Sequence, residues 1–153
     1  MVYFFDTSAL VKRYHREMGT EVVETAFDDS ETDCLISDLG VIELYSAFAK
    51  KVRTGELSKS GFEHLVQVFG RDVLDGTLRI RSLGAGDKRS AVVLLETYGT
   101  SKSLRTLDAL QLAVMINLGP GRITDVYCAD QQFLDVIEQE GFSVVNPENA
   151  ENR

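Results

Sequence analysis

An uninterrupted apolar run at residues 2–5, with the sequence VYFF, restricts the fold of this chain more than any other feature. A strand with one exposed face alternates apolar and polar residues, whereas a continuous run is typical of a strand buried on both faces. Short strand-like runs recur at residues 34–36, 123–129 and 142–145, with helical patterns between them. This alternation predicts an α/β domain in which helices cover a mostly parallel sheet.

The helical patterns fall in the segments between these runs, and capping residues or glycines mark several of their ends. Ser37 or Asp38 is expected to cap one helix, and Ser58 is expected to cap the next. The predicted helices cover residues 8–17, 21–27, 38–53, a segment after Ser58, and residues 87–98, 107–117 and 133–140. Residues 78–83 alternate between apolar and polar side chains, which predicts a half-exposed strand nearer an edge of the sheet.

The length of 153 residues is typical of one compact domain, and no linker or repeat divides the chain. We expect a single domain over residues 1–147 and a flexible tail over residues 148–153, because the last residues lack apolar side chains. Cys34 and Cys128 lie in apolar runs and are expected to be buried thiols. Neither a leader sequence nor an apolar stretch of membrane-spanning length is seen, so a cytoplasmic protein without a membrane partner is expected.

The formal net charge of −8 also limits the function of the chain. Proteins that coat nucleic acid are usually basic, so this charge argues against bulk electrostatic capture of DNA or RNA. It leaves room for a small basic rim around an acidic pocket, for metal binding by carboxylates, or for a basic protein partner.

Four acidic residues lie at positions where an α/β fold places ligands. Asp6 directly follows the first strand, and Asp130 directly follows the strand at residues 123–129. If both strands are central and parallel, both carboxylates emerge at the same edge of the sheet. Asp108 lies in the first turn of a predicted helix, and Glu43 lies on an apolar helix face.

Each acid also has a structural interpretation. Asp6 and Asp130 are suited to cap the helices that follow them. Asp108 can complement the positive end of its helix, and Glu43 can pair with a nearby Lys or Arg. If the four gather, however, their repulsion is costly unless a cation is present. Mg²⁺ and Mn²⁺ prefer oxygen ligands, so either ion suits such a pocket, although spacing alone does not establish that the acids converge.

Four short motifs contain these acids. They are FFDTSALVK at residues 4–12, SDLGVIEL at 37–44, LRTLDALQLA at 104–113 and CADQQF at 128–133. Each motif is degenerate alone, but their order and spacing together are specific. Over residues 2–147 the chain resembles a PIN domain, and in particular a VapC-type toxin ribonuclease of bacteria or archaea.

The resemblance implies a PIN-like three-layer α/β/α fold with a five-stranded parallel sheet. It implies an endoribonuclease dependent on Mg²⁺ or Mn²⁺, the toxin of a type II, VapBC-like toxin–antitoxin pair. One or two ions are expected, with RNA as substrate, a cognate antitoxin as partner and a homodimer as assembly. The residues expected to bind the metal and act in catalysis are Asp6, Glu43, Asp108 and Asp130, with Ser8 and Thr7 in support.

The chain departs from the family pattern at two positions. Gln111 stands where the third motif often has His, and this residue is not one of the acidic ligands. Cys128 stands where the fourth motif often has Ser or Thr, which is expected to alter hydrogen bonding around Asp130.

Phosphate contacts in a chain of this charge require a local basic rim. The candidates are Lys12, Arg13 and Arg16 in the helix after Asp6, and Lys102 and Arg105 just before Asp108. The bases Lys50, Lys51 and Arg53 at the end of the Glu43 helix are further candidates. For each of these residues an ordinary solvated helix face is an equally good interpretation.

Other classes of protein remain as alternatives. A catalytically weak PIN domain can act as a regulatory module that binds RNA or protein, and the complete set of acids argues against it. A response-regulator receiver needs a Lys after a late strand, but the last Lys is Lys102; a haloacid-type phosphatase needs a second Asp where Ser8 stands. The apolar residues Val22, Val23 and Phe27 fit either a dimer interface or the core.

Overall fold

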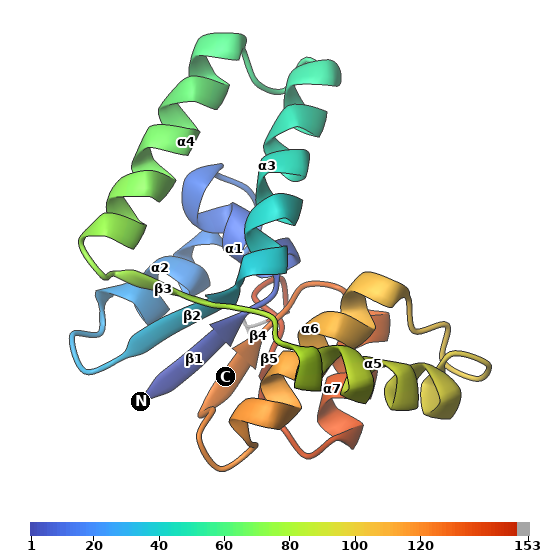
Figure 1. Ribbon diagram of the computed structural model, residues 1–153. Coiled ribbons are helices and arrows are strands. Elements are labelled where there is room, and N and C mark those ends of the chain that lie inside the picture. Colours follow the sequence, from blue (N-terminus) through green and yellow to red (C-terminus); the bar gives the residue numbers. More distant parts are fainter. Residues whose placement is uncertain (150–153) are drawn as a thin grey trace.

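A computed structural model describes residues 1–149 and shows a five-stranded parallel sheet between two groups of helices (Figure 1). The strands are β1 (Val2–Phe5), β2 (Asp33–Ser37), β3 (Leu78–Arg81), β4 (Asp125–Tyr127) and β5 (Val144–Val145). The helices are α1 (Thr7–Tyr14), α2 (Thr20–Asp28), α3 (Asp38–Arg53), α4 (Lys59–Leu74), α5 (Ala85–Tyr98), α6 (Thr106–Leu118) and α7 (Gln131–Gln139). The expected α/β/α fold with five parallel strands is confirmed.

The strand order in the sheet is β3-β2-β1-β4-β5. The chain runs outward from β1 through β2 to β3, and then returns to the other side of β1 to add β4 and β5. The strand order therefore switches between β1 and β4, where the backbone N–H of Asp6 donates to the Tyr127 carbonyl at 2.9 Å. Ligand sites of open parallel sheets lie beyond the carboxyl ends of the strands at such a switch point.

Each face of the sheet has its own core, because successive residues of a strand point to opposite faces. Phe4 packs with buried residues of α5, α6 and α7, whereas Phe5 packs with residues of α1 to α4. Both phenylalanines are fully buried, as the uninterrupted run at residues 2–5 predicts. Val23 is buried in the second core, and the Phe27 ring lies 4.9 Å from the Phe5 ring, so these side chains belong to the core.

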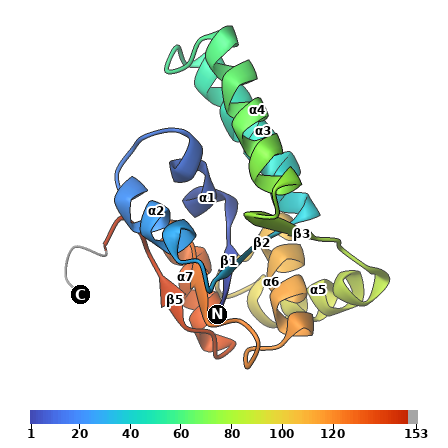
Figure 2. The ribbon, with the colours of Figure 1, turned by 90° about the vertical axis from the view of Figure 1, so that its left-hand side faces the viewer.

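Helices α3 and α4 form an arm that projects beyond the sheet (Figure 2). Edge-on aromatic contacts hold the two helices together, with the Tyr45 ring 6.4 Å from Phe62 and 6.0 Å from Phe69. Tyr14 of α1 contacts the rings of Phe48 and Phe69 and so attaches the arm to the body. The base of α3, which carries Glu43, is thereby fixed beside the end of β1.

Several details bear on the expectations from sequence. Cys34 and Cys128 are buried free thiols, as expected. Glu148, which was expected in a flexible tail, forms an ion pair with Lys12 at 2.6 Å, and residues 150–153 of that tail lie outside the described residues. Among residues 1–149 no helix is long and apolar enough to cross a membrane.

Candidate acidic site

The four acids singled out in the sequence lie around one cleft of about 310 Å³ at the carboxyl end of the sheet. They come from four separate segments: the end of β1, the second turn of α3, the first turn of α6 and the loop after β4. The residues that line the cleft are Asp6, Thr7, Ser8, Glu43, Ser46, Arg105, Leu107, Asp108, Asp130 and Phe133. All the acids and both supporting hydroxyl residues named from sequence are therefore brought together.

Asp6 is 7% exposed and has a structural role beside its place in the cleft. It caps α1, since its Oδ2 accepts from the Ser8 backbone N–H at 2.9 Å and also from the Ser8 hydroxyl. The same Ser8 Oγ accepts from the Ala129 N–H at 2.9 Å, which joins the ends of β1 and β4. Oδ1 of Asp6 instead accepts from the side-chain amide of Gln111 at 3.0 Å.

Glu43 is half-buried on the side of the cleft formed by α3. Its Oε2 accepts from the Gln111 amide at 2.6 Å and lies 3.4 Å from the Thr7 hydroxyl. Burial raises the pKa of Glu43 to about 7, and the negative charges of Asp6 and Asp108 act in the same direction. The raised pKa of Glu43 thus reflects both its burial and the repulsion from neighbouring carboxylates.

Asp108 and Asp130 share one basic partner. The Arg105 guanidinium donates through Nε to Asp108 and through Nη2 to Asp130, at 3.0 Å in each case. Burial raises the pKa of Asp108 despite this partner, with further contributions from Asp6 and Asp130. The Oδ1 atom of Asp130 caps α7 by accepting from two backbone N–H groups, so its Oδ2 is the oxygen that faces Arg105.

Only some of the bases expected to form a rim lie at the cleft. Arg105 lines the cleft, and Lys102 lies with it in an adjoining hollow. Lys12 and Arg13 do not reach the cleft, which corrects the expectation that they contact substrate there. Lys12 is 2% exposed and pairs with Glu17 and Glu148, and Arg13 pairs with Asp72 of α4 at 2.7 Å.

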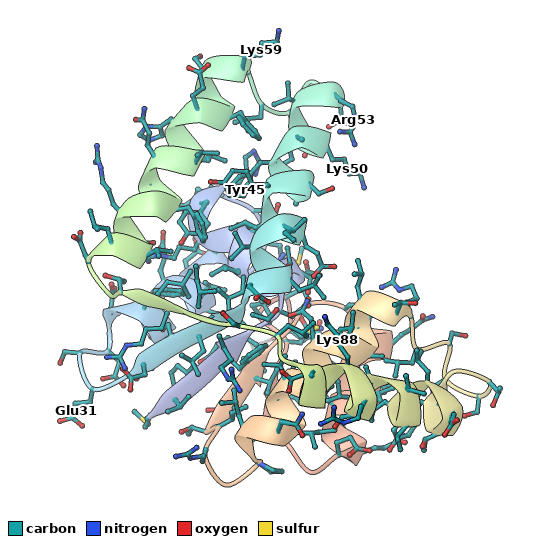
Figure 3. All side chains as sticks on the ribbon, in the orientation of Figure 1. Glu31, Tyr45, Lys50, Arg53, Lys59 and Lys88 are labelled. Atoms are coloured by element: carbon teal, nitrogen blue, oxygen red, sulfur yellow. The ribbon has the colours of Figure 1, made fainter. Side chains whose placement is uncertain are left out.

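The bases of the α3–α4 arm lie farther away. Figure 3 shows Lys50, Arg53 and Lys59 near the end of the α3–α4 arm, away from the sheet. Lys51, also on this arm, forms ion pairs with Glu17 and Glu56. The local rim at the cleft therefore consists of Arg105 and Lys102.

The two departures from the family pattern both contact Asp6. The thiol of Cys128 lies 3.6 Å from Asp6 Oδ2 and 3.6 Å from Ser8 Oγ. Burial raises the pKa of this thiol, so it remains protonated beside the carboxylate. Gln111 contacts Asp6 and Glu43 together, which the sequence did not indicate, because its partners lie 105 and 68 residues away along the chain.

The donor atoms of the cleft fit a hard divalent cation in kind, since four carboxylates offer only oxygen. Burial is the largest cause of the raised pKa values of Glu43 and Asp108, and neighbouring carboxylates add to it, so a bound cation would offset part of this effect. Within residues 1–149, however, no three Asp, Glu, His or Cys side chains are gathered closely enough to hold an ion as they stand. Arg105 bridges Asp108 and Asp130, so metal binding by these two acids requires the Arg105 side chain to move.

A model of the PIN domain family matches residues 3–136, which is most of the chain. This protein therefore belongs to the PIN domain family. No curated protein matches it in sequence.

Solved structures share the fold at low sequence identity. VapC20 from Mycobacterium tuberculosis, described as a sarcin–ricin loop cleaving toxin, is 18% identical with a TM-score of 0.69 over 95% of this chain and 99% of that one. FitAcB from Neisseria gonorrhoeae is 17% identical with a TM-score of 0.68 over 97% and 99% of the two chains. VapBC2 from Rickettsia felis, bound to a promoter DNA fragment, is 16% identical with a TM-score of 0.65 over 95% and 98%.

Proposed function

We propose that this protein is a Mg²⁺- or Mn²⁺-dependent endoribonuclease and the toxin of a VapBC-like toxin–antitoxin pair. The observation that carries the proposal is the convergence of Asp6, Glu43, Asp108 and Asp130 on one cleft at the switch point of a PIN fold. Helix capping explains the positions of Asp6 and Asp130. It does not explain Glu43, which lies inside α3, caps no helix end and still lines the same cleft.

The acids would hold one or two ions through their oxygens, directly or through water. A bound ion would supply a water nucleophile at neutral pH and neutralise charge on the phosphate that is attacked. Asp6 and Asp130 can each offer one oxygen while the other continues to cap a helix. Thr7 and Ser8 would orient the acids, because their hydroxyls lie against Glu43 and Asp6.

Arg105 can pair either with the carboxylates of the cleft or with an RNA phosphate. Its guanidinium bridges Asp108 and Asp130, but its side chain is 71% exposed and free to turn. Asp108 and Asp130 would hold the cation in place of Arg105, and the guanidinium would then be free at the mouth of the cleft to contact an RNA phosphate. Lys102 would add a second phosphate contact beside it.

The neighbouring structures also support an antitoxin as partner. Solved complexes with the same fold include VapBC2 and a toxin–antitoxin complex from Klebsiella pneumoniae, 18% identical to this chain with a TM-score of 0.63. The cleft combines carboxylates with the exposed side chain of Leu107. Such a surface suits a partner segment that carries a basic and an apolar side chain. A homodimer completes the proposal, and light scattering of the purified protein would measure it.

A second function is favoured by the ion pairs of Arg105. A PIN domain in which Arg105 is never displaced from Asp108 and Asp130 would bind RNA or protein without cleaving it. The two functions differ in whether a divalent cation produces turnover.

The test is cleavage of RNA by the purified protein with Mg²⁺ or Mn²⁺, followed by sequencing of the new RNA ends. We expect cleavage at defined sites, loss of cleavage with EDTA, and recovery when excess Mn²⁺ is added. Asp6→Asn and Asp108→Asn should abolish cleavage. Asp125→Asn is the matched control, because Asp125 lies at the opposite end of β4 and bonds only with Ser143 among its described side-chain hydrogen bonds.

Cleavage that resists EDTA would exclude the metal mechanism. Cleavage that persists in Asp6→Asn would point to a contaminating nuclease. RNA binding without turnover in the wild type, at every metal concentration tried, would favour the binding module.

A further inference from the structure

Gln111 is a buried polar side chain in an otherwise apolar stretch of α6. It is 1% exposed, and its neighbours Leu112, Ala113, Val114 and Met115 are fully buried. Placing an amide in such surroundings costs free energy unless its polar atoms find partners. The partners that Gln111 finds belong to the candidate site.

The amide nitrogen of Gln111 bridges two acids from different parts of the fold. Nε2 donates to Asp6 Oδ1 at 3.0 Å and to Glu43 Oε2 at 2.6 Å. A side-chain amide has two N–H hydrogens, so each carboxylate receives one. Asp6 follows β1 and Glu43 lies in α3, so this nitrogen links the two walls of the cleft.

The orientation of the amide is set from its other end. Oε1 of Gln111 accepts from the Ser37 hydroxyl at 3.3 Å. Ser37 Oγ in turn accepts from the Gly40 N–H at 3.0 Å as the N-cap of α3, which leaves its hydrogen available for Gln111. Turning the amide over would place its oxygen against two carboxylates, so this network fixes the nitrogen toward Asp6 and Glu43.

We propose that Gln111 is a positioning residue that holds Asp6 and Glu43 side by side for a divalent cation. The inference rests on the proposed metal-dependent function. An amide is suited to this task because it donates two hydrogen bonds yet carries no charge. A Lys or Arg at this position would instead neutralise the carboxylates and compete with the ion, as Arg105 does on the other side of the cleft.

The test is the affinity for Mn²⁺, measured by calorimetry without RNA. Gln111→Met keeps the length of the side chain but removes both donors, and we expect Mn²⁺ binding to weaken by about 10- to 100-fold, as is common when groups that orient metal ligands are lost. Gln111→His, whose ring can still donate from nitrogen, should recover part of this loss. Leu112→Met is the matched control on the same helix and should bind Mn²⁺ like the wild type.

RNA cleavage supplies a second measurement. Raising the Mn²⁺ concentration should restore the rate of Gln111→Met to near that of the wild type, because the acids that bind the ion are intact. If Gln111→Met does not fold, Gln111→Asn keeps the amide but is one methylene shorter, and the same weakening is expected.

The inference is overturned if the folded Gln111 variants bind Mn²⁺ as tightly as the wild type. It is also overturned if excess Mn²⁺ fails to restore their rate. The proposed function fails separately, by the absence of cleavage in the wild type, and a wild type that binds no Mn²⁺ would refute both.

Discussion

Glu43 shares the cleft with Asp6 and Asp108, and its half-buried position is the main reason that its pKa rises from 4.5 to about 7. From about pH 4.5 to 7 the unfolded chain has released this proton while the folded protein still holds it. The free energy of unfolding of the metal-free protein should therefore fall as the pH rises through this window. In Glu43→Gln this fall should be smaller by about 2 kcal/mol, discounted for partial exposure to water.

Urea unfolding in the presence of EDTA, at several pH values between 5 and 8, measures this effect. A smaller fall in the same direction should remain in Glu43→Gln, because the pKa of Asp108 is raised as well. Equal pH profiles for the wild type and Glu43→Gln would show that Glu43 is ionised in the folded protein throughout.

Single residues differed in how far the sequence predicted them. Asp6 and Asp130 were predictable because a buried apolar run precedes each of them, which fixes where the side chain emerges. The role of Gln111 was not predictable, because its contacts with Asp6 and Glu43 exist only after α6 packs beside β1 and α3. Lys12 was misplaced for a related reason, since a Lys in a helix is usually solvated, and only the folded chain shows that it is enclosed.

At the scale of elements, three helices begin with a side-chain cap at the carboxyl end of the sheet. Asp6 caps α1, Ser37 caps α3 and Asp130 caps α7. The structural and functional interpretations of Asp130 are thus compatible, because its two oxygens have different partners. The cap and the charge can be separated by substitution.

Asp130→Asn keeps an oxygen that can accept from Gln132 and Phe133, whereas Asp130→Ala removes it. We expect Asp130→Ala to lower the free energy of unfolding by about 1 kcal/mol more than Asp130→Asn. Both variants should lose most RNA cleavage, because both lack the carboxylate charge. Thermal unfolding and cleavage assays on the pair measure the two effects. If the two variants were equally stable, the cap would contribute nothing.

The positions of the elements followed from apolar patterns, but their arrangement did not. The run at residues 123–129 predicted a strand, and β4 covers the shorter range Asp125–Tyr127. The residues on either side still bond to neighbouring strands, because the Thr124 N–H donates to the Val2 carbonyl at 2.7 Å and the Cys128 N–H donates to the Val145 carbonyl at 3.1 Å. The strand order, which places β4 beside β1, depends on long-range pairing and was not predicted from the sequence.

For the whole molecule, ion pairs connect parts of the chain that lie far apart in sequence. Lys12 of α1 meets Glu17 in the loop before α2 and Glu148 after β5, and Lys51 of α3 also reaches Glu17. This network ties the C-terminal segment to the helices that surround it. It uses cations that the sequence alone suggested for RNA.

Lys12→Met keeps the length of the side chain but leaves Glu17 and Glu148 without their buried partner. We expect the free energy of unfolding to fall by about 1–2 kcal/mol, because two charged hydrogen bonds are lost but Glu17 keeps Lys51 and Glu148 is partly exposed to water. RNA cleavage by the folded variant should stay near the wild-type rate, because Lys12 does not line the cleft. Glu148→Gln is the milder control, since Lys12 keeps Glu17. Lost cleavage with unchanged stability, measured by urea unfolding, would instead make Lys12 a substrate contact.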